Sequence, residues 1–225
     1  MKPDFEIKKV KCYNVDCMAF MKEVPDNYYE LAIVDPPYGI NADKKNSDNT
    51  KKSSKSATES KYYGNQNWDN NVPTEKYFIE LMRVSKHQII WGVNYYPYPM
   101  LTGGRLYWHK NVSMPTYSDG ELAYCSLINK LTYIELTWHG MIQNNMAEKE
   151  QRIHPTQKPV QLYKWILNTY AKQGDKIIDT HGGSFSSACA CLDMGFDIDI
   201  CEIDKEYFND AVNRLKNNVQ EYLEF

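Results

Sequence analysis

The carboxyl-terminal third of the chain alternates between helical patterns and short apolar runs, and this rhythm strongly constrains the fold. The expected elements are, in order, helix 159–172, strand 176–179, helix 186–194, strand 196–201 and helix 205–219. Strands that alternate with helices form parallel sheets joined by right-handed crossovers. We therefore expect an α/β fold, with a mostly parallel seven-stranded sheet, an antiparallel strand and helices on both faces.

The first part of the chain also has strand and helix signals, but they are less regular. Pro73 near the start of a helical pattern over 73–86 is typical of a helix amino terminus. Another helix is expected at 16–22, and the expected strands are 7–13, 31–34, 88–92, 105–109, 121–125 and 133–138. Polar alternation in the last three of these strands favours edge or antiparallel positions.

Composition limits the class of protein. A chain of 225 residues fits one α/β domain, here expected over residues 1–225. The net charge of −3 argues against a tight, nonspecific nucleic-acid binder. No apolar stretch approaches the ~20 residues that span a bilayer, and the amino terminus lacks the apolar core of a signal peptide. We expect a cytoplasmic protein without membrane contact.

Six cysteines lack the spacing of a zinc site, so we predict no metal and no disulfides. They are expected to be reduced and buried. Residues 41–72 contain lysine, serine and asparagine with few apolar side chains, which predicts a flexible loop.

A stiff corner follows the first strongly apolar run. Leu31 to Val34 is typical of a buried strand, and it leads directly into Asp35-Pro36-Pro37-Tyr38. Proline fixes φ and extends the residue before it. An acidic group, bare carbonyls and an aromatic face are thereby held together at a strand's carboxyl end, where open α/β sheets bind ligands. Such a corner suits a planar amine such as that of a nucleobase, although an ordinary proline-rich turn is the simpler interpretation.

A second constellation lies near the carboxyl terminus. The strand ending at Asp179 is followed by a turn with Gly182 and Gly183, and the next strand ends at Glu202. Glycines let a backbone approach a ligand, and an acid after the second strand accepts from ribose hydroxyls. The carboxylate of Asp179 would repel a pyrophosphate. A cofactor with an ammonium and a sulfonium, S-adenosylmethionine, therefore fits this acidic turn better than NAD, while an ordinary βαβ turn remains the alternative.

Three motifs in one order resemble a known family: Asp-Pro-Pro-Tyr at 35–38, His-Pro-Thr-Gln-Lys-Pro at 154–159, and Asp-x-x-x-Gly-Ser at 179–184 followed by Glu202. The chain resembles the amino-group DNA methyltransferases of the β permutation, whose catalytic half precedes the cofactor half. The resemblance implies one Rossmann-like methyltransferase domain. Its parts are a catalytic half at 1–125, a short target-recognition segment at 126–153 and a cofactor half at 154–225.

The resemblance assigns catalytic roles to the four residues of the corner. The Asp35 carboxylate and the Pro36 carbonyl would accept hydrogen bonds from the target amino group, and Tyr38 would stack on a base flipped out of the duplex. Pro37 completes the motif. The expected partner is double-stranded DNA, and a homodimer is an open alternative for the assembly.

The resemblance also assigns the cofactor residues. Glu202 would bind the ribose of S-adenosylmethionine, Asp16 or Cys17 the adenine edge, and Gln157 and Lys158 would close the pocket near its carboxylate. The methionine part would be lined by residues from the acidic turn, namely Asp179, His181, Gly183, Ser184 and Ser186, and Asp35 is also expected to contact the cofactor.

Two positions depart from the family pattern. His181 stands where the family usually has Phe, and Phe185 where it usually has Gly. The Phe185 ring either narrows the pocket, which would weaken cofactor affinity, or packs outward.

Because Asp rather than Ser leads the first motif, we expect methylation of adenine N6, as in bacterial or phage-encoded restriction–modification. The alternatives are cytosine N4, RNA or protein amides, and a catalytically silent nucleic-acid-binding subunit.

Overall fold

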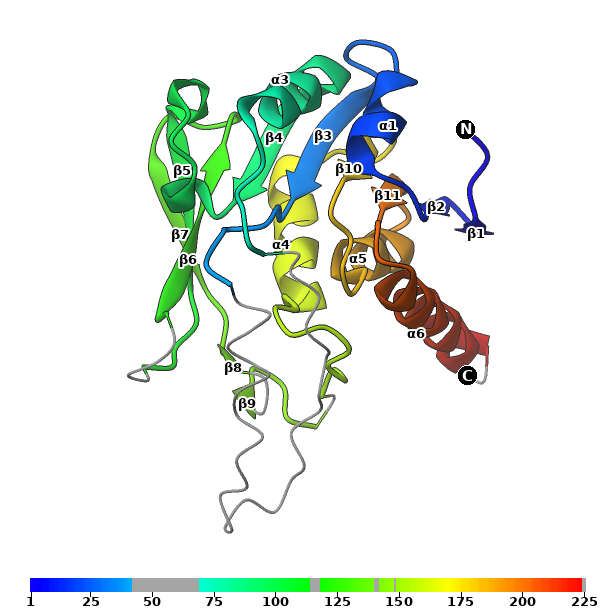
Figure 1. The fold of residues 1–225 in the computed structure, drawn as a ribbon. Helices are drawn as coiled ribbons and strands as arrows, with labels where there is room; N and C mark the ends of the chain where they lie inside the picture. The colour runs from blue at the N-terminus through cyan, green and yellow to red at the C-terminus, as the bar shows by residue number, and fades with distance from the viewer. Residues whose placement is uncertain (42–68, 114–117, 140–141, 148, 224–225) are drawn as a thin grey trace.

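A computed structural model describes residues 1–41, 69–113, 118–139, 142–147 and 149–223. The loop expected at 41–72 lies mostly outside these described residues. Within them one sheet of nine strands forms the centre of the molecule, in the order β1-β2-β11-β10-β3-β4-β6-β5-β7 (Figure 1). Its strands are β1 (Phe5–Ile7), β2 (Val10–Tyr13), β3 (Tyr29–Val34), β4 (Ser85–Trp91), β5 (Gly104–His109), β6 (Gly120–Cys125), β7 (Leu131–Glu135), β10 (Lys176–Asp179) and β11 (Asp197–Cys201).

The expected α/β class is confirmed, but the expected strand number is wrong. Seven of the nine strands run in one direction, while β1 and β6 run against them. One of the two additional strands arises because the single strand expected at 7–13 is a hairpin. Ile7 pairs with Val10, and Lys8 between them has φ 52°, a left-handed conformation that turns the chain.

Helices cover both faces of the sheet, as expected. Helices α1 (Cys17–Lys22) and α3 (Glu75–Val84) pack on one face, and α4 (Val160–Tyr170), α5 (Ser186–Met194) and α6 (Lys205–Leu223) on the other (Figure 1). The remaining elements are two 3₁₀ turns, η2 (Val93–Tyr95) and η3 (Pro99–Leu101), and a small hairpin of β8 (Trp138–His139) and β9 (Ile142–Gln143).

The alternation of side chains along β3 builds two cores at once. Leu31 and Ile33 face the core under α4 and α5, while Ala32 and Val34 face the core under α1 and α3. All four are almost completely buried, as expected for a parallel strand covered on both sides. Strand β3 lies between β10 and β4, parallel to both, so the carboxyl ends of the three strands meet at one edge.

Five of the six cysteines are buried free thiols, and Cys17 is partly exposed at the start of α1. In the part of the chain that the structure describes, no His, Cys, Asp and Glu side chains cluster in a way that could hold a metal ion. No helix among the described residues is both long and apolar enough to cross a bilayer.

Candidate active site

The corner after β3 is fixed by a buried carboxylate. Asp69 is 1% exposed, and its Oδ1 accepts the backbone N–H groups of Tyr38 at 2.7 Å and Gly39 at 2.9 Å. On the other side of the corner, the Tyr96 hydroxyl donates to the Pro36 carbonyl at 2.8 Å. These contacts hold the backbone around Asp35 without any ligand.

The ring of Tyr38 is enclosed by residues that follow β4. Gly92 has φ +75°, and a Cβ built there would lie 2.1 Å from the Tyr38 ring, so only glycine fits this position. Tyr95 stacks on the Tyr38 ring with centroids 4.9 Å apart and an interplanar angle of 14°. In the free protein Tyr38 is therefore paired with another aromatic ring.

Asp35 belongs to a largely buried cluster of four charged side chains, which also contains Lys158, Glu121 and Lys110. The Lys158 ammonium lies 2.5 Å from Asp35 Oδ2 and 2.9 Å from Glu121 Oε2. Lys110 lies 2.6 Å from Glu121 Oε1. The Tyr38 hydroxyl lies 2.6 Å from Asp35 Oδ1, which gives each Asp35 oxygen a donor. The Lys158 side chain is only 4% exposed, so this ammonium depends on the two carboxylates for its charge.

The two carboxylates of the cluster differ in acidity. Burial raises the pKa of Asp35, and the negative charge of Glu121 adds to the rise against the opposing effect of Lys158. Burial also disfavours ionised Glu121, but Lys158 and Lys110 outweigh it and lower the pKa of Glu121 to about 2. Asp35 is consequently the better proton acceptor of the pair.

The turn between β10 and α5 is held by the carboxylate that follows β11, and we call Gly183 and Glu202 together the cradle. Gly183 has φ +52°, and its N–H donates to Glu202 Oε2 at 2.8 Å. The other oxygen of Glu202 accepts the Asp204 N–H at 2.8 Å. Burial raises the pKa of Glu202. The carboxylate after β11 thus fixes the glycine turn after β10 and keeps lone pairs for a ligand hydroxyl.

Asp179 lies beneath this turn. Its Oδ1 accepts the His181 N–H at 3.0 Å, and its Oδ2 accepts the Ser187 hydroxyl at 2.6 Å. The residue is 2% exposed, and burial raises its pKa to about 7. The geometry shows Asp179 as a brace for the turn.

His181 is held by a hydrogen-bonded chain from α3. The Tyr77 hydroxyl lies 2.6 Å from Thr180 Oγ1, which lies 3.0 Å from His181 Nδ1. Burial lowers the pKa of His181 to about 4, so its ring is neutral at physiological pH. A neutral ring can approach a cationic group without repulsion.

Phe185 packs away from the cavity. It is fully buried in the core beside Phe208, with ring centroids 5.8 Å apart. Its φ is 57°, the left-handed region that favours glycine. A Cβ at Gly182 would lie 2.5 Å from the Phe185 ring. Of the two orientations expected for Phe185, the structure shows the one that packs outward. The left-handed backbone at this position gives a physical reason why the resembling family usually has glycine there.

An ionic brace supports the cradle from behind. Arg214 on α6 donates to the Ser184 carbonyl at 2.8 Å and pairs with Glu150 at 2.7 Å. Glu150 also accepts the N–H of Val160, the first residue of α4, at 2.9 Å. The brace connects the segment before α4 to the turn of the cradle.

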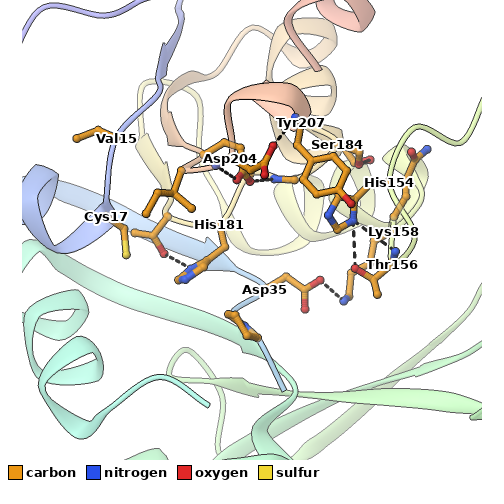
Figure 2. Close-up of a pocket in the computed structure, with 18 of the residues that line it drawn as sticks. Val15, Cys17, Asp35, His154, Thr156, Lys158, His181, Ser184, Asp204 and Tyr207 are labelled. Carbon is orange, nitrogen blue, oxygen red and sulfur yellow. Dashed lines mark hydrogen bonds and ion pairs between the residues drawn. The ribbon is translucent and has the colours of Figure 1, made fainter. Parts of the chain in front are cut away.

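These groups surround one cavity of about 330 Å³ (Figure 2). It opens between the Asp35 corner, with Lys158 pointing at Asp35, and the turn around His181 (Figure 2). The sequence-predicted residues that line it are Asp16, Cys17, Asp35, Pro37, Gln157, Lys158, His181, Gly183, Ser184, Ser186 and Glu202.

Three predicted residues, Pro36, Tyr38 and Asp179, are not among the residues that line this cavity. Asp16 caps α1 by accepting the Ala19 N–H at 3.0 Å. The Gln157 amide accepts from Ile153 N at 3.0 Å, so it is engaged with the chain preceding its own motif. The role expected for Gln157 and Lys158 beside a cofactor carboxylate stays a prediction.

Sequence reasoning missed several residues of the site. His154 belongs to the second motif and lines the cavity, and burial lowers its pKa to about 3. Other lining residues without a sequence-based role are Val15, Thr156, Tyr163, Thr180, Gly182, Ile203, Asp204 and Tyr207. Asp69, Glu121 and Tyr95 were missed because only the folded chain brings them to the corner.

The fold and the site define a class of protein: an α/β domain in which an acidic corner and a glycine turn line one cavity. A family model described as DNA methylase, for N6 and N4 methyltransferases, matches residues 109–213, somewhat less than half of the chain. A search of curated proteins gave no match.

Solved structures share the fold over nearly the whole chain. PvuII DNA methyltransferase (cytosine-N4-specific) matches with a TM-score of 0.61 and 11% identity, covering 99% of this chain and 95% of its own. The M1.HpyAVI–SAM complex matches with a TM-score of 0.56 and 19% identity, covering 91% and 99%.

TTHA0409 from Thermus thermophilus, complexed with S-adenosyl-L-methionine, matches with a TM-score of 0.53 and 12% identity, covering 95% of each chain. At these identities the likeness establishes the fold. Residues 109–213 match the DNA methylase family model, and the chain shares its fold with solved DNA methyltransferases, among them a cytosine-N4-specific one.

Proposed function

We propose that the chain is a DNA methyltransferase that uses S-adenosylmethionine to methylate the exocyclic N6 of an adenine flipped out of the duplex. The observation that carries the proposal is the position of Asp35. Its carboxylate lies in the wall of the same cavity whose opposite wall is the Gly183–Glu202 cradle. A carboxylate aimed at an amine and a cradle for a nucleoside are thereby combined in one site.

The cavity suits a nucleoside that carries positive charge. Several carboxylates reach it, among them Asp16, Asp35, Glu202 and Asp204, and its volume of about 330 Å³ is within the range of ligand sites. Glu202 would bind the ribose hydroxyls, and Asp16 or Cys17, at the start of α1, would contact the adenine edge. When bound, S-adenosylmethionine supplies a methyl group activated by the sulfonium charge.

The corner supplies two acceptors for the target amine. A nucleobase amine is a weak nucleophile because its lone pair is delocalised into the ring. Hydrogen bonds to Asp35 and to the Pro36 carbonyl favour a more tetrahedral nitrogen and stabilise the charge that grows on it. The Pro36 carbonyl already accepts from Tyr96 at 2.8 Å, and its second lone pair remains for the amine.

Asp35 then takes the proton that the methylated amine must lose. Its pKa is raised by burial, which suits a group that is an anion before the reaction and an acid after it. A base inserted beside Tyr38 has to separate that ring from Tyr95, at a cost of about 1 kcal/mol for an aromatic pair. Tyr95 is 38% exposed, so part of its side chain already faces solvent.

Cytosine N4 is the second candidate substrate. PvuII DNA methyltransferase, which is cytosine-N4-specific, shares the fold with a TM-score of 0.61. Adenine is preferred here because Asp35 leads the corner motif, whereas Ser leads it in most cytosine enzymes. We also propose the division into a catalytic half at 1–125, a recognition segment at 126–153 and a cofactor half at 154–225.

Transfer of a tritiated methyl group from S-adenosylmethionine tests the proposal. Unmethylated double-stranded DNA, RNA and protein extract are offered separately, and labelled DNA is digested to nucleosides for chromatography. We expect label in N6-methyladenine. Label in N4-methylcytosine would favour the second candidate, and label in RNA or protein alone would overturn DNA as the substrate. Cofactor binding measured by calorimetry, without any transfer, would indicate a silent subunit.

A further inference from the structure

We propose that Glu121 is a positioning residue for Asp35: it gives the Lys158 ammonium and the Tyr38 hydroxyl a second acceptor, so that Asp35 can exchange its partners when the substrate amine enters. The proposal rests on the proposed function. Glu121 has no role in the sequence motifs, and it comes from β6, the antiparallel strand inserted between β4 and β5.

Glu121 touches the same two donors as Asp35. Lys158 Nζ lies 2.5 Å from Asp35 and 2.9 Å from Glu121. The Tyr38 hydroxyl lies 2.6 Å from Asp35 and 3.0 Å from Glu121. Each donor therefore lies within hydrogen-bond distance of both carboxylates, and its shorter contact is the one to Asp35.

Shared donors matter because both Asp35 oxygens are already occupied. An amine that donates to Asp35 competes with Lys158 and Tyr38 for the same lone pairs. A buried ammonium left without a partner is strongly unfavourable. With Glu121 in place, Lys158 can shift toward the second carboxylate and stay paired, and Asp35 Oδ2, the oxygen that Lys158 held, becomes available.

The same arrangement serves the proton transfer. After methylation the N–H bond of the amine breaks, its electron pair stays on nitrogen, and the proton adds to an Asp35 oxygen. Neutral Asp35 no longer pairs with a cation. Lys158 keeps Glu121 as its counter-ion, and Lys110, 2.6 Å from the other oxygen of Glu121, holds that carboxylate ionised.

The charge of Glu121 also acts on Asp35 directly. The titratable groups that face Asp35 come from every neighbouring element: Tyr38 in the corner, Tyr96 after β4, Glu121 on β6, Lys158 and Tyr163 at α4, and Asp179 at the end of β10. Among them Glu121 raises the pKa of Asp35 and Lys158 lowers it. Removing the Glu121 charge should therefore lower the pKa of Asp35 and make it a weaker proton acceptor.

Glu121→Gln tests the proposal, because glutamine keeps the size and an acceptor oxygen but not the charge. We expect kcat for methyl transfer to fall at least about tenfold, while the dissociation constant of S-adenosylmethionine changes by less than about twofold. The acidic limb of the kcat–pH profile should move to lower pH, since Asp35 stays ionised further into acid. Glu135→Gln makes the same charge change at an exposed position of β7 and should alter neither quantity.

Lys110→Gln provides a second variant, for which we expect the pKa of Asp35 to shift in the opposite direction. It removes a cation from Glu121 and leaves more negative charge beside Asp35, so the acidic limb should move to higher pH. This variant keeps the proposal testable if Glu121→Gln does not fold. A Lys110→Gln limb that moves to lower pH or stays in place would contradict the proposal.

An activity-independent readout separates this proposal from the proposed function. Carboxyl-carbon NMR follows the titration of Asp35, assigned by its loss in Asp35→Asn, in the wild type and in Glu121→Gln. A lower Asp35 midpoint in the variant supports the role of Glu121 even if the wild type methylates no DNA, which would defeat only the proposed function. An active Glu121→Gln enzyme with wild-type kcat would overturn the positioning role. A lower kcat without a shift of the acidic limb or of the NMR midpoint would also overturn it, because Glu121 would then only support the structure and would not act on the charge of Asp35.

Discussion

The Lys158 ammonium lies 2.5 Å from the Asp35 carboxylate, although 123 residues separate them in sequence. The contact joins the corner after β3 to the segment that leads into α4, and so joins the two halves of the chain at the cavity. Because the pair is buried, each partner controls the charge of the other. The chemistry of the corner therefore depends on Lys158, a residue of the segment that leads into α4.

Asp35→Ala should abolish methyl transfer, with a loss of at least about 100-fold in kcat, because an acceptor for the target amine is removed. S-adenosylmethionine should bind with little change, since the cradle around Gly183 and Glu202 does not use this side chain. Radiolabel transfer and calorimetry measure the two effects. Asp210→Ala on the exposed side of α6 serves as the control. A parallel collapse of cofactor binding would show that the assigned role of Asp35 is wrong.

Gly92→Ala should be far more harmful than Gly195→Ala. The two glycines have nearly the same φ, +75° and +76°, so the backbone penalty of about 1 kcal/mol is common to both. Only at Gly92 would the new Cβ meet a ring, 2.1 Å from Tyr38. We expect urea unfolding to show at least about 2 kcal/mol of additional destabilisation for Gly92→Ala. Equal losses in the two variants would mean that the Tyr38 ring is not confined as described.

At position 185 the glycine variant should be more stable than the alanine variant, which reverses the order usual inside a helix. Phe185→Ala and Phe185→Gly lose the same ring, at about 3–5 kcal/mol, but glycine relieves the left-handed backbone and should be about 1 kcal/mol more stable than alanine. At Phe208, inside α6, glycine should be less stable than alanine by about 1 kcal/mol. Chemical denaturation of the four variants measures both differences. The same order at both sites would refute the strain assigned to Phe185.

Stability should depend on pH through Asp179. The pKa of this carboxyl is about 7 in the folded protein against an ordinary value of 3.8, so the folded state binds more protons between these values. The unfolding free energy of the wild type therefore falls as pH rises from about 4 to about 7, by roughly 3–4 kcal/mol from this group. Asp179→Asn should lack this contribution, so its stability relative to the wild type should grow over the same window. Parallel pH profiles of the two proteins would contradict the buried, raised-pKa assignment.

The sequence alone predicted the parts of the site that are local in the chain. The corner at Asp35 and the turn at Gly183 each combine a buried strand with turn residues, and such patterns can be recognised without the fold. The contribution of Glu121 could not be predicted, because it depends on β6 being inserted between β4 and β5. The orientation of Phe185 also required the structure, since the φ of one residue is not encoded in apolar spacing.

The hairpin at Lys8 illustrates the same limit for the fold. The run from 7 to 13 has strand character throughout, and the left-handed φ of Lys8 that divides it has no strong signal in the sequence. Asp69 lies about thirty residues along the chain from the corner it fixes, so its hydrogen bonds to the backbone N–H groups after Pro37 were visible only in the folded protein.

The central claim is that the Asp35 corner methylates the amino group of adenine in DNA. The most direct measurement is mass spectrometry of nucleosides from the DNA of a methylation-free host that expresses either the wild type or Asp35→Ala at equal levels. We expect N6-methyladenine with the wild type and none with the variant. Unmethylated adenine in both strains, while the purified wild type binds S-adenosylmethionine, would contradict it.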